Sequence, residues 1–171
     1  DRKLPPSSQE TRRSGEISPK VTRVIPAARV ELGASRRDVV FGWDNEFNAH
    51  SVDVAAFDVD SLPVSNAEYL EFVAGGGYRD KELWNDEGWD WIQREQVKHP
   101  AFWMAAASLP DDRISPDLLI SSFSWRGMFA AFPLPPTWPV FVSQAEAPAY
   151  ARWKGRRLMT EAEWHRAAEG A

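Results

Sequence analysis

The histidines are the first residues whose chemistry could define a site. His50, His99 and His165 are far apart, and no two stand three or four residues apart as a helical metal pair would. A metal site would need tertiary folding to bring its ligands together, so we interpret them as surface or hydrogen-bonded histidines. The chain has no cysteine, which excludes disulfides, thiolate metal ligands and cysteine nucleophiles within it. We therefore assign no metal ligand to this chain.

Carboxylates and glycines offer two further patterns. Asp58 and Asp60 lie two apart on one face of an expected strand. Such a pair could perform acid–base chemistry, but solvent-facing strand charges give the same pattern, and we favour that interpretation. The three glycines at 75–77 follow an expected helix and lack a GK[ST] continuation. They predict a helix end rather than a phosphate-binding loop.

An aromatic stretch combines ring faces with polar groups. WNDEGWDW, residues 84–91, places Trp84, Trp89 and Trp91 among acids and an amide. Because quaternary ammonium groups bind well to indole faces, this stretch could form a wall for a cationic, methylated ligand. Packing of a long loop around its own small core explains the same residues, and we favour it.

A second stretch, FGWDNE at residues 41–46, is denser in polar groups. Trp43 is followed by Asp44, Asn45 and Glu46, and the Asp-Asn pair suits a turn that hydrogen-bonds its own backbone. A substrate contact and a turn both stay open here, with the turn slightly favoured. The candidate substrate-binding residues are therefore Trp43, Asp44, Asn45, Glu46, Trp89 and Trp91.

Composition limits the class of protein. A chain of 171 residues, 43% of them hydrophobic, can bury one sizeable core, and most of its nine tryptophans must be buried or line a groove. The net charge of -5 and the pI of 5.3 argue against a nucleic-acid partner. No apolar run is long enough to span a membrane, and the N-terminus lacks a signal pattern. We expect a cytoplasmic protein with no membrane partner, and the start at Asp1 suggests a fragment or a processed form.

The N-terminal segment differs from the rest. Residues 1–20 are polar and contain prolines, so they cannot bury enough surface to offset their ordering entropy. We predict a disordered tail or linker over residues 1–23 and one ordered domain over residues 24–171.

Short strands and capped helices are expected in that domain. Alternating apolar residues predict strands within residues 21–34, 51–60 and 139–143. In the second strand the alternation at Val52 and Val54 resumes out of phase at Phe57, which predicts a bulge at residues 55–56.

Three helices are indicated by capping boxes, in which a hydroxyl residue is followed three positions later by glutamate. The pairs are Ser65 with Glu68, Ser143 with Glu146, and Thr160 with Glu163. The first two helices should end at Gly75 and Gly155, and the third should bury Trp164, Ala167 and Ala168. The long stretch between the first two helices shows little periodicity and is expected to be an ordered excursion. Together these elements predict the α+β class.

Five segments give the sequence a specific resemblance. They are FGWDNE at 41–46, VDVAAFDVDSLPVSNAEYLEFV at 52–73, GGYRDKELWNDEGWDW at 76–91, HPAFW at 99–103 and WPVFVSQAEAPAYARWKGRRLMTEAEWHRAA at 138–168. In this order they resemble the formylglycine-generating-enzyme (sulfatase-modifying factor) domain. Three parts of this sequence look most like the C-terminal domain of ergothioneine-forming sulfoxide synthases. They are GWDNE at 42–46, GWDW at 88–91 and residues 125–140. The resemblance implies a C-type-lectin-like α+β fold, truncated to its N-terminal half.

The resemblance also implies a division of labour within a longer parent protein. In the sulfoxide synthases the iron ligands belong to an N-terminal helical domain, and the tyrosine that delivers a proton lies in the C-terminal half. No catalytic residue of the family maps onto this chain, so we expect no cofactor here, whereas the parent would use non-heme iron. The implied partners are the remainder of its own domain, that helical domain and a small-molecule substrate. Met159, His165 and Asn48 depart from the family pattern but leave the cap at Thr160 in place.

The implied function is that of a fragment of an iron-dependent sulfoxide synthase that forms a C–S bond on trimethylated histidine. This segment would act as scaffold and as part of the substrate wall, and alone it should be inactive. The alternatives are a non-catalytic lectin-like binding module, a truncated gene product, and a formylglycine-generating oxidoreductase acting on sulfatases, whose cysteine pair would fall beyond residue 171. We also expect marginal stability with exposed tryptophans, because part of the core would be missing.

Overall fold

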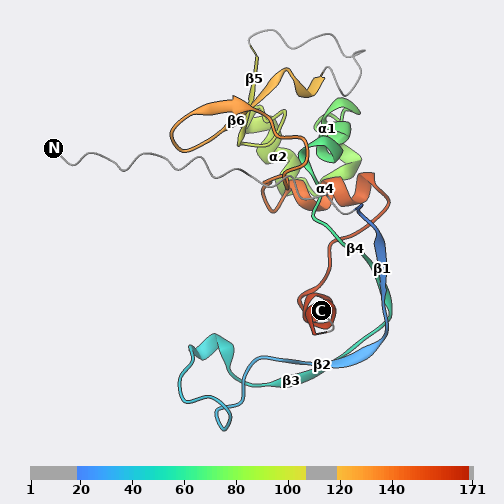
Figure 1. The fold of residues 1–171 in the computed structure, drawn as a ribbon, viewed down its shortest axis with the longest axis vertical. Helices are drawn as coiled ribbons and strands as arrows, with labels where there is room; N and C mark the ends of the chain where they lie inside the picture. Colours follow the sequence, from blue (N-terminus) through green and yellow to red (C-terminus); the bar gives the residue numbers. More distant parts are fainter. Residues whose placement is uncertain (1–18, 107–118, 170–171) are drawn as a thin grey trace, which may run out of the picture.

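The computed structural model describes residues 19–106 and 119–169, which form two connected regions (Figure 1). One region is a head of helices with a small sheet, and the other is a long two-stranded ribbon with the last helix beside it. Helices and antiparallel strands occur together, in agreement with the α+β class. Most of the expected tail lies outside the described residues, and the first strand already begins at Thr22.

The ribbon consists of two antiparallel strand pairs that follow one another. β1 (Thr22–Ile25) pairs with β4 (Phe57–Asp60), and β2 (Ala28–Leu32) pairs with β3 (His50–Val54). Gly33 ends β2 as expected, with φ of 77°, a conformation that favours glycine.

The bulge predicted at residues 55–56 is wrong, as the residues between the two strand pairs show. A bulge adds a residue to one strand only, whereas here two residues intervene on each strand and the register continues unchanged. Val54 and Phe57 nevertheless pack against the same apolar cluster. A bend of both strands, visible in Figure 1, therefore keeps the apolar side chains on one face of the ribbon.

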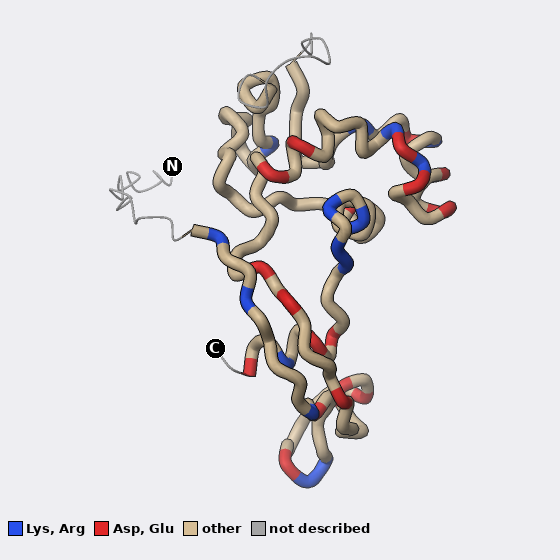
Figure 2. Tube along the Cα trace, turned by 90° about the vertical axis from the view of Figure 1, so that its right-hand side faces the viewer, with Lys and Arg blue, Asp and Glu red and all other residues tan. Residues whose placement is uncertain are grey.

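Charged residues of both signs occur along the strands of the ribbon (Figure 2). Arg29 donates to both carboxylate oxygens of Asp53 on the opposite strand, at 2.8 and 3.1 Å. Asp58 and Asp60 are exposed on β4, and Lys20 lies 3.4 Å from Asp60. The carboxylate pair thus faces solvent, as the favoured interpretation of the sequence expects.

In the head, α1 (Asn66–Ala74) begins at the first predicted capping box. Ser65 Oγ accepts a hydrogen bond from the Glu68 backbone N–H at 3.3 Å, and the Glu68 carboxylate accepts one from the Ser65 N–H at 2.7 Å. The helix ends at Gly75, also as predicted. These reciprocal bonds satisfy donors that would otherwise lack partners at the helix start.

The second capping box forms before α4 (Glu146–Trp153). The Ser143 N–H donates to the Glu146 carboxylate at 2.6 Å, and the Glu146 N–H donates to Ser143 Oγ at 3.3 Å. The regular helix nevertheless begins only at Glu146, because Pro148 has no backbone donor for the first turn. Gly155, with φ of 65°, turns the chain away after this helix.

The stretch between α1 and α4 holds elements that the sequence patterns did not indicate. α2 (Asp86–Glu95) begins after Asn85, whose side chain accepts from the Gly88 N–H at 2.8 Å. The three strands of an antiparallel sheet follow in the described part of the stretch: β5 (Trp103–Ala105), β6 (Phe123–Arg126) and β7 (Ala131–Pro133). The long excursion therefore contains a helix and a small sheet, joined by loops.

The strand predicted at residues 139–143 is wrong. This segment makes a single antiparallel bridge, between Pro139 and Ser65, and one neighbouring hydrogen bond from the Val140 N–H to the Val64 carbonyl at 2.9 Å. Proline cannot donate to a strand ladder, so pairing does not extend from this point.

Aromatic rings fill the core of the head. Phe72 is completely buried and lies 5.2–6.4 Å, between ring centroids, from five other rings, those of Tyr69, Tyr78, Trp84, Tyr150 and Trp153. A Cβ on Gly77 would lie 2.1 Å from the Phe72 ring, so the chain needs glycine there. The glycines at 75–77 thus end a helix and make room for the core, and no phosphate loop is formed.

The last helix, α5 (Glu161–Ala168), packs on the ribbon rather than on the head. Its third capping box is present at Thr160. The small side chain of Ala162 is buried against Val30, Leu32 and Val54, the second apolar cluster of the molecule.

The predicted buried face of α5 is wrong. Trp164 is 57% exposed and Ala168 is exposed, while Ala167 is half-buried. The first turn of the helix, with Ala162 and Glu163, faces the strands instead. Only a small residue at this point lets the helix approach the ribbon closely, and Trp164 then points away from it.

We expect α5 to lose part of its anchoring in acid. Arg157, which donates to Glu163 Oε2 at 2.7 Å, and the Thr160 N–H at 2.8 Å lower the pKa of Glu163 to about 2. Because this pKa lies below the unfolded value of about 4.3, the stabilisation is complete above that pH and is lost as the pH falls toward 2. Backbone NMR signals of α5 should report the loss.

The matched control for this titration is Glu161→Gln, an exposed glutamate of the same helix turn. It should leave the acid profile of α5 as in the unmodified chain. Glu163→Gln should weaken the anchoring already at neutral pH and flatten the profile between about pH 4.3 and 2. An unchanged profile in Glu163→Gln would show that another group controls the acid behaviour.

Candidate functional site

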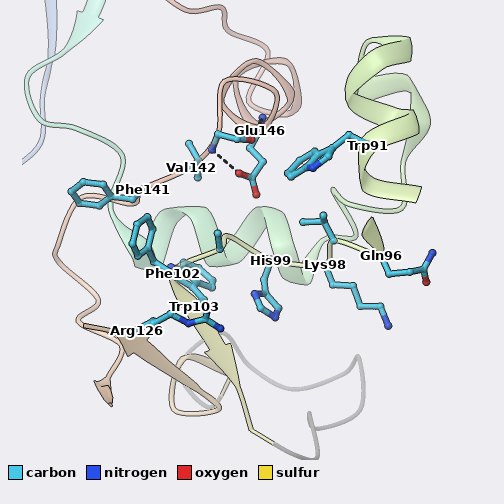
Figure 3. Close-up of a pocket in the computed structure, with 13 residues that line it drawn as sticks. Trp91, Gln96, Lys98, His99, Phe102, Trp103, Arg126, Phe141, Val142 and Glu146 are labelled. Atoms are coloured by element: carbon cyan, nitrogen blue, oxygen red, sulfur yellow. Dashed lines mark hydrogen bonds between the residues drawn. The ribbon is translucent and has the colours of Figure 1, made fainter. Parts of the chain in front are cut away.

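The head contains a cavity of about 710 Å³ (Figure 3), a volume typical of small-molecule sites. Its walls come from the end of α2 and the loop after it, from the end of β6, and from the segment that leads into α4. The aromatic side chains that line it are Trp91, Phe102, Trp103 and Phe141. In Figure 3, Glu146 and Trp91 lie on one side of the cavity, and His99, Phe102 and Trp103 lie on the other.

The end of α2 directs the chain along the cavity. Gln96 adopts a left-handed conformation with φ of 52°, and its N–H donates to the Ile92 carbonyl. This conformation ends the helix and changes the direction of the chain, so that the following residues run along the cavity. Lys98 and His99 reach the lining in this way, while Pro100 is buried behind them.

A buried polar contact fixes the floor of the cavity. The Trp103 indole N–H donates to Asn66 Oδ1 at 3.3 Å, and the Asn66 side-chain amide donates to the Pro135 carbonyl at 2.7 Å. Both Trp103 and Asn66 are at most 1% exposed. Asn66, the first residue of α1, thus fixes the position of Trp103 relative to the loop that contains Pro135.

Glu146 is the acidic group of the cavity, and it is only 2% exposed. Its two carboxyl oxygens accept from the Tyr78 hydroxyl and from the Ser143 N–H. Burial raises the pKa of Tyr78 above its usual value, and the neighbouring Tyr69 and Glu146 raise it further, so the phenol remains a donor. The carboxyl group is therefore held by the protein itself.

The opposite side of the cavity carries basic groups. Lys98 and Arg126 are exposed, and His99 is half-buried with its Nδ1 3.1 Å from the Pro100 carbonyl oxygen. In the described part of the chain, neither Lys98 nor Arg126 forms an ion pair with an acidic side chain.

The structure does not bring the six predicted site residues together. Trp91 lines the cavity, whereas Trp89, on the same helix, packs partly buried against the core of the head. Residues 43–46 lie in the loop between β2 and β3, at the opposite end of the molecule (Figure 1). The aromatic stretch at 84–91 mostly serves packing, since the Trp84 indole N–H is buried and donates to the Gly77 carbonyl at 2.8 Å.

The GWDNE strip forms a turn. Asp44–Glu46 is a short 3-10 helix (η1), and the Trp43 N–H donates to Glu46 Oε2 at 2.8 Å. Arg36 lies 3.7 Å from Asp44 and over the Phe47 ring, so the loop has its own contacts. Trp43 remains 69% exposed, which leaves a role in contacts outside this chain open to test.

The described residues do not assemble a metal site. His50 is exposed on β3, His99 lies at the cavity, and His165 is on α5. Among residues 19–106 and 119–169, no three histidine, cysteine or carboxylate side chains lie close enough to hold a metal ion. These residues therefore do not fit the iron that the resemblance implies for the parent.

Several cavity residues were not singled out from the sequence. Glu146 was predicted only as a helix cap, and Lys98, Phe102, Arg126 and Phe141 were not proposed as site residues. HPAFW, residues 99–103, is one of the segments that carry the resemblance, and its histidine followed by two adjacent aromatic residues was the available signal for His99, Phe102 and Trp103. Separately, no helix in the described ranges is both long and apolar enough to cross a membrane.

Comparison with known proteins gives a consistent family. A profile of the sulfatase-modifying factor enzyme 1-like domain matches residues 8–171, so the match extends into the segment expected to be a tail. The hercynine oxygenase of Mycolicibacterium thermoresistibile is 38% identical over 137 residues, which are 80% of this chain and 27% of that protein. The hercynine oxygenase of Mycobacterium tuberculosis is 36% identical over 138 residues, 80% of this chain and 29% of that protein.

The formylglycine-generating enzymes are also similar. The enzyme of Thermomonospora curvata is 31% identical over 168 residues, 93% of this chain and 52% of that enzyme. The chain thus spans about half of this relative and less than a third of the two hercynine oxygenases.

Proposed function

The chain belongs to the sulfatase-modifying factor enzyme 1-like family, and on that premise we propose that it is part of an oxygenase acting on trimethylated histidine. The observation that carries the proposal is the 36–38% identity to two hercynine oxygenases over 80% of the chain. The parent would join a thiol to the imidazole ring as a sulfoxide, with O₂ as oxidant and water as the second product. The fold we propose for the complete domain is C-type-lectin-like, and we propose the cytoplasm as its location.

The role proposed for this segment is that of scaffold and part of the substrate wall. The head supplies rigid packing around its aromatic core, and the ribbon holds the GWDNE turn at the other end. Trp89 and Trp91 are proposed to contribute to the wall from the head, and Trp43–Glu46 are proposed to contribute separately, from the far end of the ribbon. A helical domain of the parent would supply the iron ligands, because the described residues offer no suitable set.

The experiment that tests this function uses the full-length gene product that carries the chain. Supplied with Fe(II), O₂, a cysteine-containing thiol and trimethylated histidine, it should yield a product with a new C–S bond, detected by mass spectrometry. Residues 1–171 alone should bind no stoichiometric iron and show no turnover. A full-length protein that leaves trimethylated histidine unchanged, or one tight iron per isolated chain, would contradict the proposal.

A second function is favoured by the similarity to formylglycine-generating enzymes, which covers 93% of the chain. In that case the full-length protein should convert the cysteine of a sulfatase peptide to formylglycine. The same assay with both substrates separates the two functions, because each predicts reaction with only one of them.

A further inference from the structure

The charge around the cavity is arranged in a way that selects a ligand. The basic groups of Lys98, His99 and Arg126 lie on the side opposite Glu146 (Figure 3). Among the described residues, a ligand that enters therefore meets basic groups on one side and the carboxyl group of Glu146 on the other.

Glu146 is a poor partner for a cationic ligand. It is 2% exposed, and each of its oxygens already accepts a hydrogen bond, from the Tyr78 hydroxyl and the Ser143 N–H. A ligand cation would have to displace or share these bonds. The carboxyl group is thus committed to the helix cap and to the core.

Lys98 and Arg126 can bind an anion without giving up an ion pair to any described residue. Both are exposed, and no carboxylate of the described residues pairs with either. Arginine in particular presents a planar fork that matches a carboxylate. An acid on this side of the cavity would gain a charged partner without breaking an ion pair between described residues.

Aromatic rings at the end of the cavity that carries Arg126 offer a flat apolar surface. Phe102 stacks on Trp125 with ring centroids 5.5 Å apart and meets Phe141 edge-on at 6.0 Å. Phe102 and Phe141 are 45% and 55% exposed, so their faces are incompletely covered. A planar ligand body could cover apolar surface that now meets water.

We propose that this cavity binds a small organic anion with a flat apolar body. The acid group lies against Arg126, Lys98 adds positive charge further along the same side of the cavity, and the body packs against Phe102 and Phe141. This inference goes beyond the proposed function, because it concerns an anionic ligand and holds whichever reaction the parent catalyses. The size of the cavity, about 710 Å³, accommodates a molecule of this class.

Two probes with the same body and opposite charge test the proposal. 3-Phenylpropionate and 3-phenylpropylamine are titrated into residues 1–171, with binding followed by NMR shifts of the indole N–H signals of Trp91 and Trp103. We expect the acid to bind at least about tenfold more tightly than the amine, given the strength of a close charge pair at a protein surface. Equal affinities, a preference for the amine, or no saturable binding of the acid would overturn it.

Matched variants locate the site. Lys98→Gln with Arg126→Gln should weaken 3-phenylpropionate binding about tenfold, because both positive charges at the edge are lost. Arg23→Gln with Arg94→Gln removes the same net charge from exposed positions outside the cavity lining and should leave the affinity unchanged. All four side chains are exposed, and an unchanged indole spectrum checks the fold of each variant. Equal affinity in the two double variants would overturn the assignment.

Discussion

Phe72→Ala should lower the free energy of unfolding by about 3–5 kcal/mol, the usual cost of truncating a fully buried aromatic ring. Phe72 is completely buried and in contact with five other rings of the head. Its ring fills the space in which a Cβ of residue 77 would otherwise lie, so its removal leaves a cavity beside Gly77. Urea denaturation followed by tryptophan emission measures the loss, since Trp84 and Trp153 lie beside the site.

The matched control is Phe129→Ala. Phe129 is 95% exposed on the turn between β6 and β7, so its truncation removes the same atoms without leaving a cavity. Its effect should stay within about 0.5 kcal/mol. Because small domains are only marginally stable, Phe72→Ala could unfold the head outright, and Phe72→Leu then gives a measurable intermediate loss. Equal effects of Phe72→Ala and Phe129→Ala would mean that the head has no fixed core.

Local hydrogen-bond chemistry is what the sequence predicts best in this protein. The capping boxes at Ser65, Ser143 and Thr160 are confirmed, because each depends on residues three positions apart whose bonds form wherever a helix starts. The ends at Gly75 and Gly155 are confirmed for a similar local reason.

Tertiary packing explains the elements that the sequence did not reveal. α2 begins after Asn85, with Gly88 three positions later, so it lacks the hydroxyl–glutamate capping box that indicated the other helices, and its tryptophans were interpreted as packing of a loop. The strands β5 and β7 have three residues each, too few for an alternating pattern to be distinctive. The exposed Trp164 shows the opposite case, in which a large apolar residue on a helix does not mark the packed face.

The cavity was only partly predictable. Trp91 was among the candidate residues, but its partners Phe102 and Phe141 come from segments that meet only in the folded chain. The GWDNE strip was expected near the same wall, whereas the ribbon carries it to the far end of the molecule. The separation between the GWDNE turn and the cavity follows from the length and bend of the ribbon, which no short sequence motif encodes.

Glu146→Ala should cost about 2–3 kcal/mol, because it removes the acceptor for two donors at once. The buried Tyr78 hydroxyl would lose its carboxylate acceptor and keep only the long contact with the Tyr69 hydroxyl at 3.4 Å, and a poorly satisfied buried donor costs about 1–3 kcal/mol. The Ser143 N–H would also lose its cap, although water can reach this exposed residue and replace part of the bond. Burial and the neighbouring groups raise the pKa of Tyr78, so the phenol cannot ionise to relieve the loss.

Two further variants separate the contribution of the buried carboxylate from that of a negative charge at the start of a helix. They are Glu87→Ala and Glu146→Gln. Glu87 lies in the first turn of α2 as Glu146 does in α4, but it is exposed, so its loss should cost less than about 1 kcal/mol. Glu146→Gln keeps the shape but offers one acceptor oxygen where the carboxylate offers two, so its stability should fall between that of Glu146→Ala and the unmodified chain. Thermal unfolding of the three variants would rank them, and a Glu146→Ala chain as stable as Glu87→Ala would show that the Tyr78 contact does not hold α4 to the core.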